Sequence, residues 1–378
     1  MNVTLSLAEA ESIIRTRERF GVRLGTERIQ RLLGILGYPQ KRYPSIHIVG
    51  TNGKSTTARA LEEVLRGEGL TVGTYLSPHV TSFSERFRVG GNELDICRVV
   101  GPILEAVEEI DRDMEEPVTQ FELLTAAALF AFAEHKVDVS VIEAGLGGRH
   151  DATNVIDAGV VVLTNVALDH QRQLGMNRMS ISEEKLAVLR PGSTLVLGDS
   201  DLEGRAREIG AGCVIHAATS YELAHAAAEA YLDRKIHHDS SSYVSLPGRL
   251  EVVNTFSGET WDGAHNPHAV EWLAKELEEE EYVIVLSILS DKDIDGMLKA
   301  FATIGRSMIA TGSSNPRALS GTELAEWAHS TQLYDEVFAI NDPVSAREFG
   351  LRMAEGKGRP LLVSGSLYLL HDLFSIRA

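Results

Sequence analysis

Short apolar runs of strand length alternate with stretches of helical length along most of the chain. In the first half, such runs occupy residues 46–49, 71–76, 137–144 and 160–165, and an apolar-rich stretch of helical length spans residues 120–135. Strands that are apolar along their whole length are typical of a parallel sheet with helices on both faces. The pattern therefore predicts an α/β fold with a doubly wound, mainly parallel sheet.

The same alternation starts again near Pro247 and predicts a second, smaller domain of the Rossmann type. Its expected helices are 267–279, 294–304, 321–329 and 343–354, and its expected strands are 282–289, 307–311, 336–340 and 360–364. We therefore expect an N-terminal domain of residues 1–246 and a C-terminal domain of residues 247–378. The polar run 239–242 just before the boundary favours a flexible connection.

Composition narrows the class of protein. The chain has 378 residues, of which 44% are hydrophobic and 24% charged, as in soluble globular proteins. Its formal net charge of -18 argues against nucleic acid as the main partner. No signal peptide is indicated, and the apolar runs are shorter than the ~20 residues of a membrane span. Two cysteines give no disulfide framework, so we expect a cytoplasmic protein without a membrane partner.

A glycine turn, a lysine and hydroxyl side chains follow the first apolar strand. The segment reads Gly50-Thr51-Asn52-Gly53-Lys54-Ser55-Thr56. Glycines let backbone N–H groups approach phosphate oxygens, and the helix that follows presents its positive end. Lys54 can reach the terminal phosphates, while Ser55 or Thr56 can face a magnesium ion. The segment therefore predicts a phosphate-binding loop and a P-loop-type N-terminal domain, although it is shorter than the common form.

A carboxylate occupies the end of another predicted strand. Glu143 stands directly before the turn Gly145-Leu146-Gly147-Gly148. Parallel sheets bind ligands at the carboxyl ends of their strands, and Mg²⁺ prefers oxygen ligands. We therefore expect Glu143 to be a magnesium ligand, with a solvated glutamate at a strand end as the alternative.

Together these segments resemble the folylpolyglutamate synthase and dihydrofolate synthase family of the Mur ligase superfamily. The segments that carry the resemblance are residues 44–57, 75–79, 83–88, 142–155, 164–170, 262–267, 317–319 and 363–368. The resemblance extends from about residue 20 to about residue 373. It implies a monomeric, ATP-dependent ligase that joins L-glutamate to the carboxylate of dihydropteroate or a folate through an acyl phosphate.

The resemblance also implies how metal ions are held. Ser77 and Glu143 would bind a first magnesium ion, and His170 and Lys185 a second. An ammonium group cannot ligate a cation, so the family's lysine is carbamylated by carbon dioxide, which makes it a carboxylate. The alternative for Lys185 is a solvated lysine paired with neighbouring glutamates on a helix surface. The implied catalytic residues are Lys54, Glu143, His170 and Lys185.

Two further sets of residues are implied for the substrates. The ATP-binding set is Thr51, Asn52, Gly53, Lys54, Ser55, Thr56, Arg249 and Asp262. The set for the acid and for glutamate is Phe121, Asp151, Ala152, Thr153, Asn154, His265 and Asn266. Alternatives remain open for some of these residues: Phe121 as a core side chain, and Asn266 as a helix cap. Arg86 and Arg88, in the family's mobile loop, could meet anionic groups or be solvated charges on a strand.

Three features depart from the family pattern. Lys54 runs directly into Ser55, where the family has an extra glycine, and His225 stands where an asparagine usually contacts the adenine. The chain is also shorter than most relatives, mainly within residues 200–245. Two other functions therefore remain open: a Mur-type ligase for a different acid and amine, and a nucleotide-binding relative without catalysis.

Overall fold

The computed structural model describes residues 5–21, 23–236, 244–254, 258–277 and 281–376. The chain divides into two compact units. Unit 1 comprises Met1–Ala167 and Gln171–Val244, whereas unit 2 comprises Leu168–His170 and Ser245–Ala378. The predicted flexible run 239–242 lies outside the described residues.

Unit 1 is built on an eight-stranded sheet with the order β4-β3-β2-β5-β1-β6-β7-β8. The strands are β1 Ser45–Val49, β2 Val72–Tyr75, β3 Phe87–Val89, β4 Asn92–Glu93, β5 Val139–Glu143, β6 Ala158–Leu163, β7 Thr194–Leu197 and β8 Cys213–His216. Neighbouring strands are parallel throughout the part β2-β5-β1-β6-β7-β8 of this order. Strands β3 and β4 add an antiparallel edge next to β2. The predicted α/β class with a mainly parallel sheet is confirmed.

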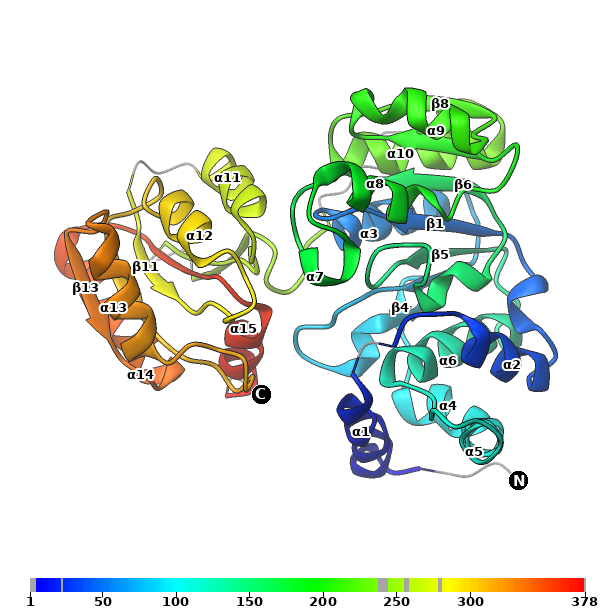
Figure 1. Ribbon diagram of the computed structural model, residues 1–378, viewed down its shortest axis with the longest axis horizontal. Helices are drawn as coiled ribbons and strands as arrows, with labels where there is room; N and C mark the ends of the chain where they lie inside the picture. Colours follow the sequence, from blue (N-terminus) through cyan, green and yellow to red (C-terminus); the bar gives the residue numbers. More distant parts are fainter. Residues whose placement is uncertain (1–4, 22, 237–243, 255–257, 278–280, 377–378) are drawn as a thin grey trace. The chain divides into compact units, whose positions relative to one another are not determined.

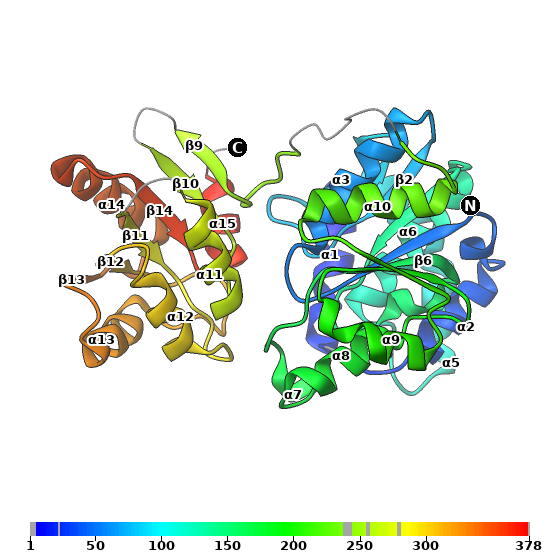
Figure 2. The same ribbon diagram turned by 90° about the horizontal axis from the view of Figure 1, so that it is seen from above.

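Both faces of this sheet are buried. On one face, Ile46 and Ile48 of β1 pack with α3 (Lys54–Gly67) and α10 (Ser220–Leu232), and Figure 2 shows these two helices side by side. On the opposite face, Val49 belongs to the core formed with α6 (Gln120–Glu134). Because successive residues of β1 point into two apolar cores, the strand reads as a continuous apolar run.

Helix α6 is the central helix of the second face. Residues 123–128 are all fully buried, since the helix lies between the sheet and an outer layer of shorter helices (Figure 1). The outer helices that contact it are α1 (Leu7–Thr16), α2 (Glu27–Ile35) and α4 (Ile96–Val100), and α5 (Leu104–Asp113) packs on α2. The remaining helices of unit 1 are α7 (Gln171–Leu174), α8 (Arg178–Leu186) and α9 (Glu203–Ile209).

Unit 2 holds a six-stranded sheet with the order β13-β12-β11-β14-β10-β9, in which only β9 is antiparallel to its neighbour among the described strands. The strands are β9 Glu251–Asn254, β10 Glu259–Trp261, β11 Val283–Leu286, β12 Ser307–Ala310, β13 Glu336–Ala339 and β14 Leu361–Ser364. The helices are α11 Pro267–Glu276, α12 Ile294–Phe301, α13 Gly321–Thr331, α14 Pro343–Lys357 and α15 Leu367–Phe374. The α/β architecture predicted for the C-terminal half is confirmed.

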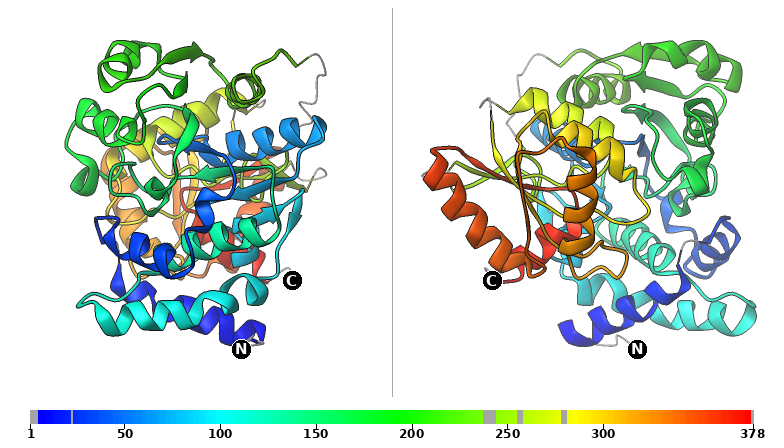
Figure 3. Two further views of the ribbon diagram at one scale, coloured as in Figure 1. Left: turned by 90° about the vertical axis from the view of Figure 1, so that its right-hand side faces the viewer. Right: turned by 60° about the vertical axis from the view of Figure 1, so that its left-hand side comes forward.

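The helices of unit 2 cover both faces of its sheet (Figure 3). Helices α11, α12 and α13 share one core with Ile284, Met308 and Leu362. On the other face, Gly350 of α14 approaches Val285 so closely that a Cβ atom would lie 2.8 Å from its methyl carbon. In the described part of both units, no helix is long and apolar enough to cross a membrane.

Candidate active site

The predicted phosphate loop lies between β1 and α3. Gly50 has φ +150°, and a Cβ atom there would lie 1.9 Å from Thr164 Oγ1. Gly53 adopts a left-handed conformation at φ +79°, directly before the helix begins at Lys54. Both conformations favour glycine. The loop therefore brings the first turn of α3, the positive end of that helix, to the carboxyl edge of the sheet.

The residues that follow β6 support this loop. Thr164 Oγ1 donates a hydrogen bond to Asn52 O over 2.7 Å, and Asn52 N donates to Asn165 Oδ1 over 3.0 Å. Thr51 N donates to Asn165 O over 2.9 Å. Sequence reasoning left Thr164 and Asn165 out of the site, although both open the segment 164–170 that carried the resemblance. Their role is to hold the loop backbone in a fixed conformation.

Three predicted residues meet at the ends of neighbouring strands. Ser55 Oγ, in the first turn of α3, lies 2.9 Å from both carboxylate oxygens of Glu143, which is 1% exposed. Ser77 N, after β2, donates to Glu143 Oε2 over 3.0 Å. The alternative of a solvated strand-end glutamate is therefore wrong. Lys54 shares the loop, and its Nζ donates to Thr51 O over 3.2 Å.

The oxygen atoms of this cluster fit a magnesium ion. A buried carboxylate beside two serines offers hard oxygen donors, and Mg²⁺ in nucleotide sites uses few protein ligands because phosphates and waters complete its shell. Among the described residues, no group of three or more His, Cys, Asp and Glu side chains is arranged to hold a metal. The cluster thus suits a nucleotide-bound cation better than a metal held by protein alone.

Lys185 lies on α8 and is 3% exposed. Its Nζ donates to Gly50 O, in the phosphate loop, over 2.7 Å. The glutamates beside it in the sequence have other partners, since Glu183 pairs with Arg205 and Glu184 with Arg149, each over 3.0 Å. The alternative of a solvated lysine on a helix surface is therefore wrong.

Arg86 and Arg88 are not solvated charges either. Arg86 is 7% exposed, and its Nη1 lies 3.4 Å from Ser77 Oγ while its Nε donates to His79 Nδ1 over 2.9 Å. Arg88 pairs with the buried carboxylate of Glu62 over 3.2 Å. Arg86 therefore places a positive charge beside the serine that was predicted to bind the first metal ion.

The segment 145–155 forms a buried hydrogen-bond network. Asp151 accepts from Leu146 N over 2.7 Å, from Thr153 N over 2.9 Å and from Thr153 Oγ1 over 2.5 Å. Since the Thr153 hydroxyl donates to Asp151, it accepts from His47 Nε2, 2.8 Å away on β1. Burial raises the pKa of Asp151 and lowers that of His47 to about 3. Asp151 and Thr153, which were both predicted to contact the substrate, therefore use their side chains to organise their own loop.

Asn154 and Ala152 complete the same segment. Asn154 Nδ2 donates to Arg149 O over 3.0 Å, and its Oδ1 accepts from Arg190 over 2.8 Å. Ala152 is 5% exposed. The surface that this segment presents to a ligand is therefore mostly backbone.

Phe121 lies next to this segment, at the start of α6. Its ring centroid is 6.1 Å from that of Tyr75, and a Cβ atom on Gly145 would lie 2.5 Å from its Cζ. The ring is only partly buried, in contrast to the fully buried side chains later in the helix. Phe121 thus packs against the core with one part of its ring and leaves another part accessible.

His170 groups with unit 2, whereas Glu143 and the phosphate loop belong to unit 1. The residue before it, Asp169, accepts from Lys292 Nζ over 2.7 Å and from Asn266 Nδ2 over 3.2 Å, and lies 3.4 Å from His265 Nε2. Burial by itself would raise the pKa of Asp169, but the hydrogen bond from His265 and the charge of Lys292 outweigh it and lower the pKa. Sequence reasoning placed Lys292 at the edge of the second sheet but did not pair it with Asp169, whose carboxylate contacts both predicted glutamate-site residues.

Asp262 is also buried in unit 2. Its carboxylate accepts from Leu250 N over 2.9 Å and from Ala264 N over 2.8 Å. Burial raises the pKa of Asp262, although the charge of the neighbouring Arg249 opposes the shift. Asn266 caps α11 by accepting from Ala269 N over 2.9 Å. The predicted helix cap is therefore confirmed, and its amide still donates to Asp169.

His225, which stands where the family usually has an adenine-contacting asparagine, lies on α10. This helix begins at Ser220, whose hydroxyl would lie 3.2 Å from a Cβ atom on Gly53. Its first turn therefore lies against the phosphate loop. His225 lies about 1.4 turns further along the helix, is partly exposed, and has its Nδ1 3.9 Å from Glu229 Oε1.

The fold and this site together define an ATP-dependent ligase of the Mur type. A shortened phosphate loop at the end of β1 and a buried carboxylate at the end of β5 lie at one sheet edge, and a second α/β unit follows. A family model described as "Mur ligase, glutamate ligase domain" matches residues 248–367, within unit 2.

Comparison with curated proteins narrows the class. The chain is 32% identical to the dihydrofolate synthase/folylpolyglutamate synthase of Mycobacterium tuberculosis, over 79% of the chain and 76% of that protein. It is 29% identical to the Bacillus subtilis protein of the same name, over 97% of both. The chain therefore belongs to the dihydrofolate synthase/folylpolyglutamate synthase family, as the sequence motifs predicted.

Solved structures agree over the whole chain. Mycobacterium tuberculosis folylpolyglutamate synthase, complexed with ADP and AMPPCP, matches with a TM-score of 0.90, 27% identity and 98% coverage of both chains. Escherichia coli FolC in complex with DHPP and ADP matches with a TM-score of 0.86, 28% identity and 97% coverage of both. A bifunctional folylpolyglutamate synthase/dihydrofolate synthase with Mn, AMPPNP and L-glutamate bound matches with a TM-score of 0.83, 27% identity and 98% coverage of both chains.

Proposed function

We propose that this chain is an ATP-dependent ligase that attaches L-glutamate to the carboxylate of dihydropteroate, of a folate, or of both. The observation that carries the proposal is the cluster of Ser55, Ser77 and Glu143 beside the phosphate loop. Binding of ADP with DHPP, and of L-glutamate, by its structural relatives supports this choice of substrates.

The reaction needs two displacements. A carboxylate oxygen of the acid attacks the γ-phosphorus of ATP, the bond to ADP breaks, and ADP leaves. The glutamate amine then attacks the acyl carbon, phosphate leaves with the bonding electrons, and the nitrogen loses a proton. Lys54 and the loop N–H groups stabilise the negative charge on the transferred phosphoryl group. They also hold the nucleotide in line with the acid.

Divalent metal ions belong to this proposal. Glu143 and the hydroxyls of Ser55 and Ser77 would hold a first Mg²⁺ ion, and His170 with a carbamylated Lys185 a second. Bound Mg²⁺ neutralises phosphate charge and thereby favours transfer. Burial of Lys185 against Gly50 O supports its place near the nucleotide. The carbamate forms when the uncharged amine attacks carbon dioxide and a proton leaves.

The remaining roles follow the two units. Residues 1–246 would bind ATP and the pterin, with Phe121 as an aromatic wall and residues 151–154 as its polar edge. Residues 247–378 would supply Arg249 and Asp262 to ATP and His265 and Asn266 to glutamate. We further propose that the enzyme is a cytoplasmic monomer.

A Mur-type ligase for another acid is the second candidate. The direct step from Lys54 to Ser55, without the family's extra glycine, favours it, because peptidoglycan-building Mur ligases share that shorter loop. A relative that binds nucleotide without catalysis is disfavoured by the contact between Ser55 and the buried carboxylate of Glu143, beside Lys54.

The test measures ADP release and product masses with ATP, Mg²⁺ and L-glutamate, supplying dihydropteroate and a reduced monoglutamyl folate in separate reactions. We expect a glutamylated product from at least one acid, and the acid that reacts distinguishes synthase from polyglutamylation activity. The Lys54→Ala variant should form no product. ATP binding without product from either acid would contradict the proposal and favour a ligase for another acid or a non-catalytic relative.

A further inference from the structure

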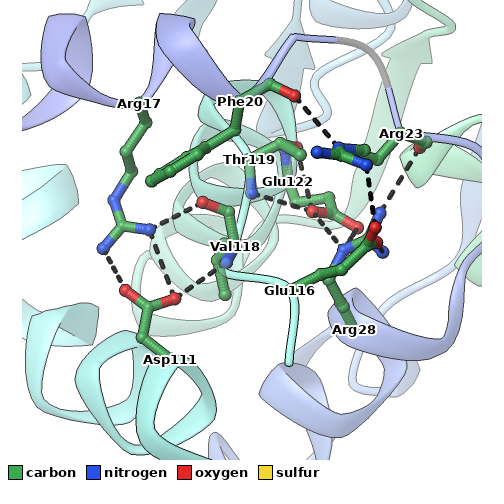
Figure 4. Close-up of polar contacts among 9 residues, drawn as sticks. All are labelled: Arg17, Phe20, Arg23, Arg28, Asp111, Glu116, Val118, Thr119 and Glu122. Carbon is green, nitrogen blue, oxygen red and sulfur yellow. Dashed lines mark hydrogen bonds and ion pairs between the residues drawn. The ribbon is translucent and has the colours of Figure 1, made fainter. Parts of the chain in front are cut away.

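Two arginines from the N-terminal segment reach the start of α6 (Figure 4). Arg28, on α2, places Nε 3.1 Å from both carboxylate oxygens of Glu122. Its Nη1 donates to Glu116 over 2.7 Å. Arg17, just after α1, donates to Val118 O over 2.6 Å and pairs with Asp111 over 2.7 Å. Side chains from the N-terminal segment, Arg17 and Arg28, therefore hold the turn that precedes α6.

The Glu122 carboxylate both caps α6 and pairs with Arg28. Its Oε2 accepts from Thr119 N and Thr119 Oγ1, each over 2.9 Å, which closes the capping box of α6. The same carboxylate receives Arg28. The side chains of Arg28 and Glu122 are only 8% and 4% exposed. If one of the two charges is removed, water therefore cannot solvate the other.

This buried pair adjoins the aromatic ring that the proposed function gives to the acid substrate. Phe121 directly precedes Glu122 in the first turn of α6, so the cap that fixes Glu122 also fixes the backbone from which the Phe121 ring projects. The ring lies between Tyr75, 6.1 Å away by centroids, and the backbone of Gly145. A change in the first turn would therefore move the ring relative to the Gly145 turn.

We infer that Arg28 is a positioning residue for the heterocycle of the acid substrate: by pairing with Glu122, it sets the Phe121 ring. The inference rests on the proposed function, because it takes Phe121 as the wall of the pterin site. Arg28 contacts neither the phosphate loop nor Glu143 in any described hydrogen bond or ion pair. Its loss should therefore weaken binding of the acid and leave the ATP site unchanged.

The experiment compares Arg28→Met and Glu122→Gln with wild type in steady-state kinetics. For Arg28→Met we expect the KM for the acid to rise about tenfold, while kcat and the KM for ATP stay within about twofold. Glu122→Gln should shift the same constant in the same direction. An unchanged KM for the acid in both variants would overturn the inference.

A matched control separates positioning from stability. Arg347 also pairs with a buried carboxylate: its Nε and Nη2 donate to Glu259, which is fully buried in unit 2, over 2.6 and 2.7 Å. Arg347→Met should lower the Tm as Arg28→Met does, yet leave the KM for the acid unchanged. If both variants raise that KM equally, the effect is general destabilisation and the inference is wrong.

A double-mutant cycle tests whether Arg28 acts through Phe121. Phe121→Leu should itself raise the KM for the acid, and Arg28→Met should then add less than about twofold in that background. Full additivity would overturn the inference. If Arg28→Met does not fold, Arg28→Lys replaces it, because it keeps the charge and loses the forked contact; we then expect an intermediate KM.

Failure of the proposed function gives a different result. Wild-type enzyme that forms no product from either pterin acid refutes the proposed function before any variant is compared. Wild-type turnover with an unchanged Arg28→Met KM refutes only the positioning role.

Discussion

At the scale of single residues, several buried polar groups of unit 1 either lie beside the phosphate loop or hold a neighbouring loop in place. Glu143, Ser55 and Lys185 contact the phosphate loop or one another. His47 and Asp151 instead form a chain through Thr153 that ties the segment after β5 to β1. Residue type alone does not distinguish these tasks, since both sets are buried and hydrogen-bonded.

The pKa of His47 leads to a prediction for the free energy of unfolding. The folded chain keeps His47 neutral to about pH 3, because burial opposes its protonation, whereas an unfolded histidine titrates near pH 6.5. The unfolded state therefore binds an additional proton below pH 6.5. Stability from this residue is complete above pH 6.5 and falls as the pH decreases toward 3, by about 2 kcal/mol at pH 5.

Urea unfolding of wild type and His47→Gln at pH 8 and pH 5 measures this pH-dependent contribution of His47 to the free energy of unfolding. Glutamine retains an N–H donor for Thr153 and does not titrate, so the difference between the two proteins should shrink or reverse at pH 5. Equal pH dependence of both proteins would show that His47 takes up a proton while folded.

Lys185 gives a second prediction at this scale. Lys185→Ala should lower kcat at least 100-fold, and short carboxylic acids in the buffer should restore part of it by supplying the missing carboxylate near the second cation. Lys185→Arg is the control, because it keeps a cation and fills the site. Activity that is unchanged in Lys185→Ala, or a loss that no acid restores, would contradict a carbamate at this position.

At the scale of elements, close backbone contacts decide where the site forms. The turn after β1 packs against Thr164, and the turn after β7 does the same, since a Cβ atom on Gly198 would lie 1.9 Å from Thr164 O. Thr164, directly after β6, thus lies between two glycines at positions that leave no room for a side chain. The phosphate loop owes its shape to this packing as well as to its own sequence.

Gly50→Ala tests the loop as an element. The new Cβ would overlap Thr164 Oγ1, and φ +150° is unfavourable for alanine, so we expect loss of ATP binding and a lower Tm. The control is Gly204→Ala on α9, where nothing lies within 4 Å of the added carbon. That change should stabilise the helix by about 0.5–1 kcal/mol. Normal ATP affinity in Gly50→Ala, by isothermal titration, would refute the packing argument.

At the scale of the whole molecule, two α/β units are joined in one chain of a known ligase family. Each unit has its own sheet and its own core. The segment Leu168–His170 is the exception, because it groups with unit 2 although its sequence neighbours belong to unit 1. Asp169 with Lys292 accounts for this, since their buried charges satisfy each other.

Nucleotide binding should appear as a gain in stability of the folded chain. With Mg²⁺ and ATP at 100 times the dissociation constant, the free energy of unfolding should rise by about 2.7 kcal/mol. Lys54→Ala should lose most of that gain, whereas Lys357→Ala, which removes a peripheral pair with Glu336, should keep it. An equal shift in Lys54→Ala, by differential scanning fluorimetry, would argue against a phosphate contact for Lys54.

Much of this protein could be predicted from the order of its residues. Buried parallel strands must be apolar on both faces, and a phosphate loop needs glycines before a lysine. Both patterns are local in the sequence, so the sequence alone predicts the strands and the loop. The α/β class and the ligase family are confirmed on that basis. The individual roles of the predicted site residues stay predictions, although Ser55, Ser77 and Glu143 are brought together.

Only the tertiary structure decided which polar residues became partners. Asp169 meets Lys292 across 123 positions of sequence, and Arg28 meets Glu122 across 94. Sequence spacing cannot reveal such pairs, because charges so far apart meet only after helices and strands have packed. Burial then makes each pair obligatory, since an unpartnered charge in the interior costs several kcal/mol.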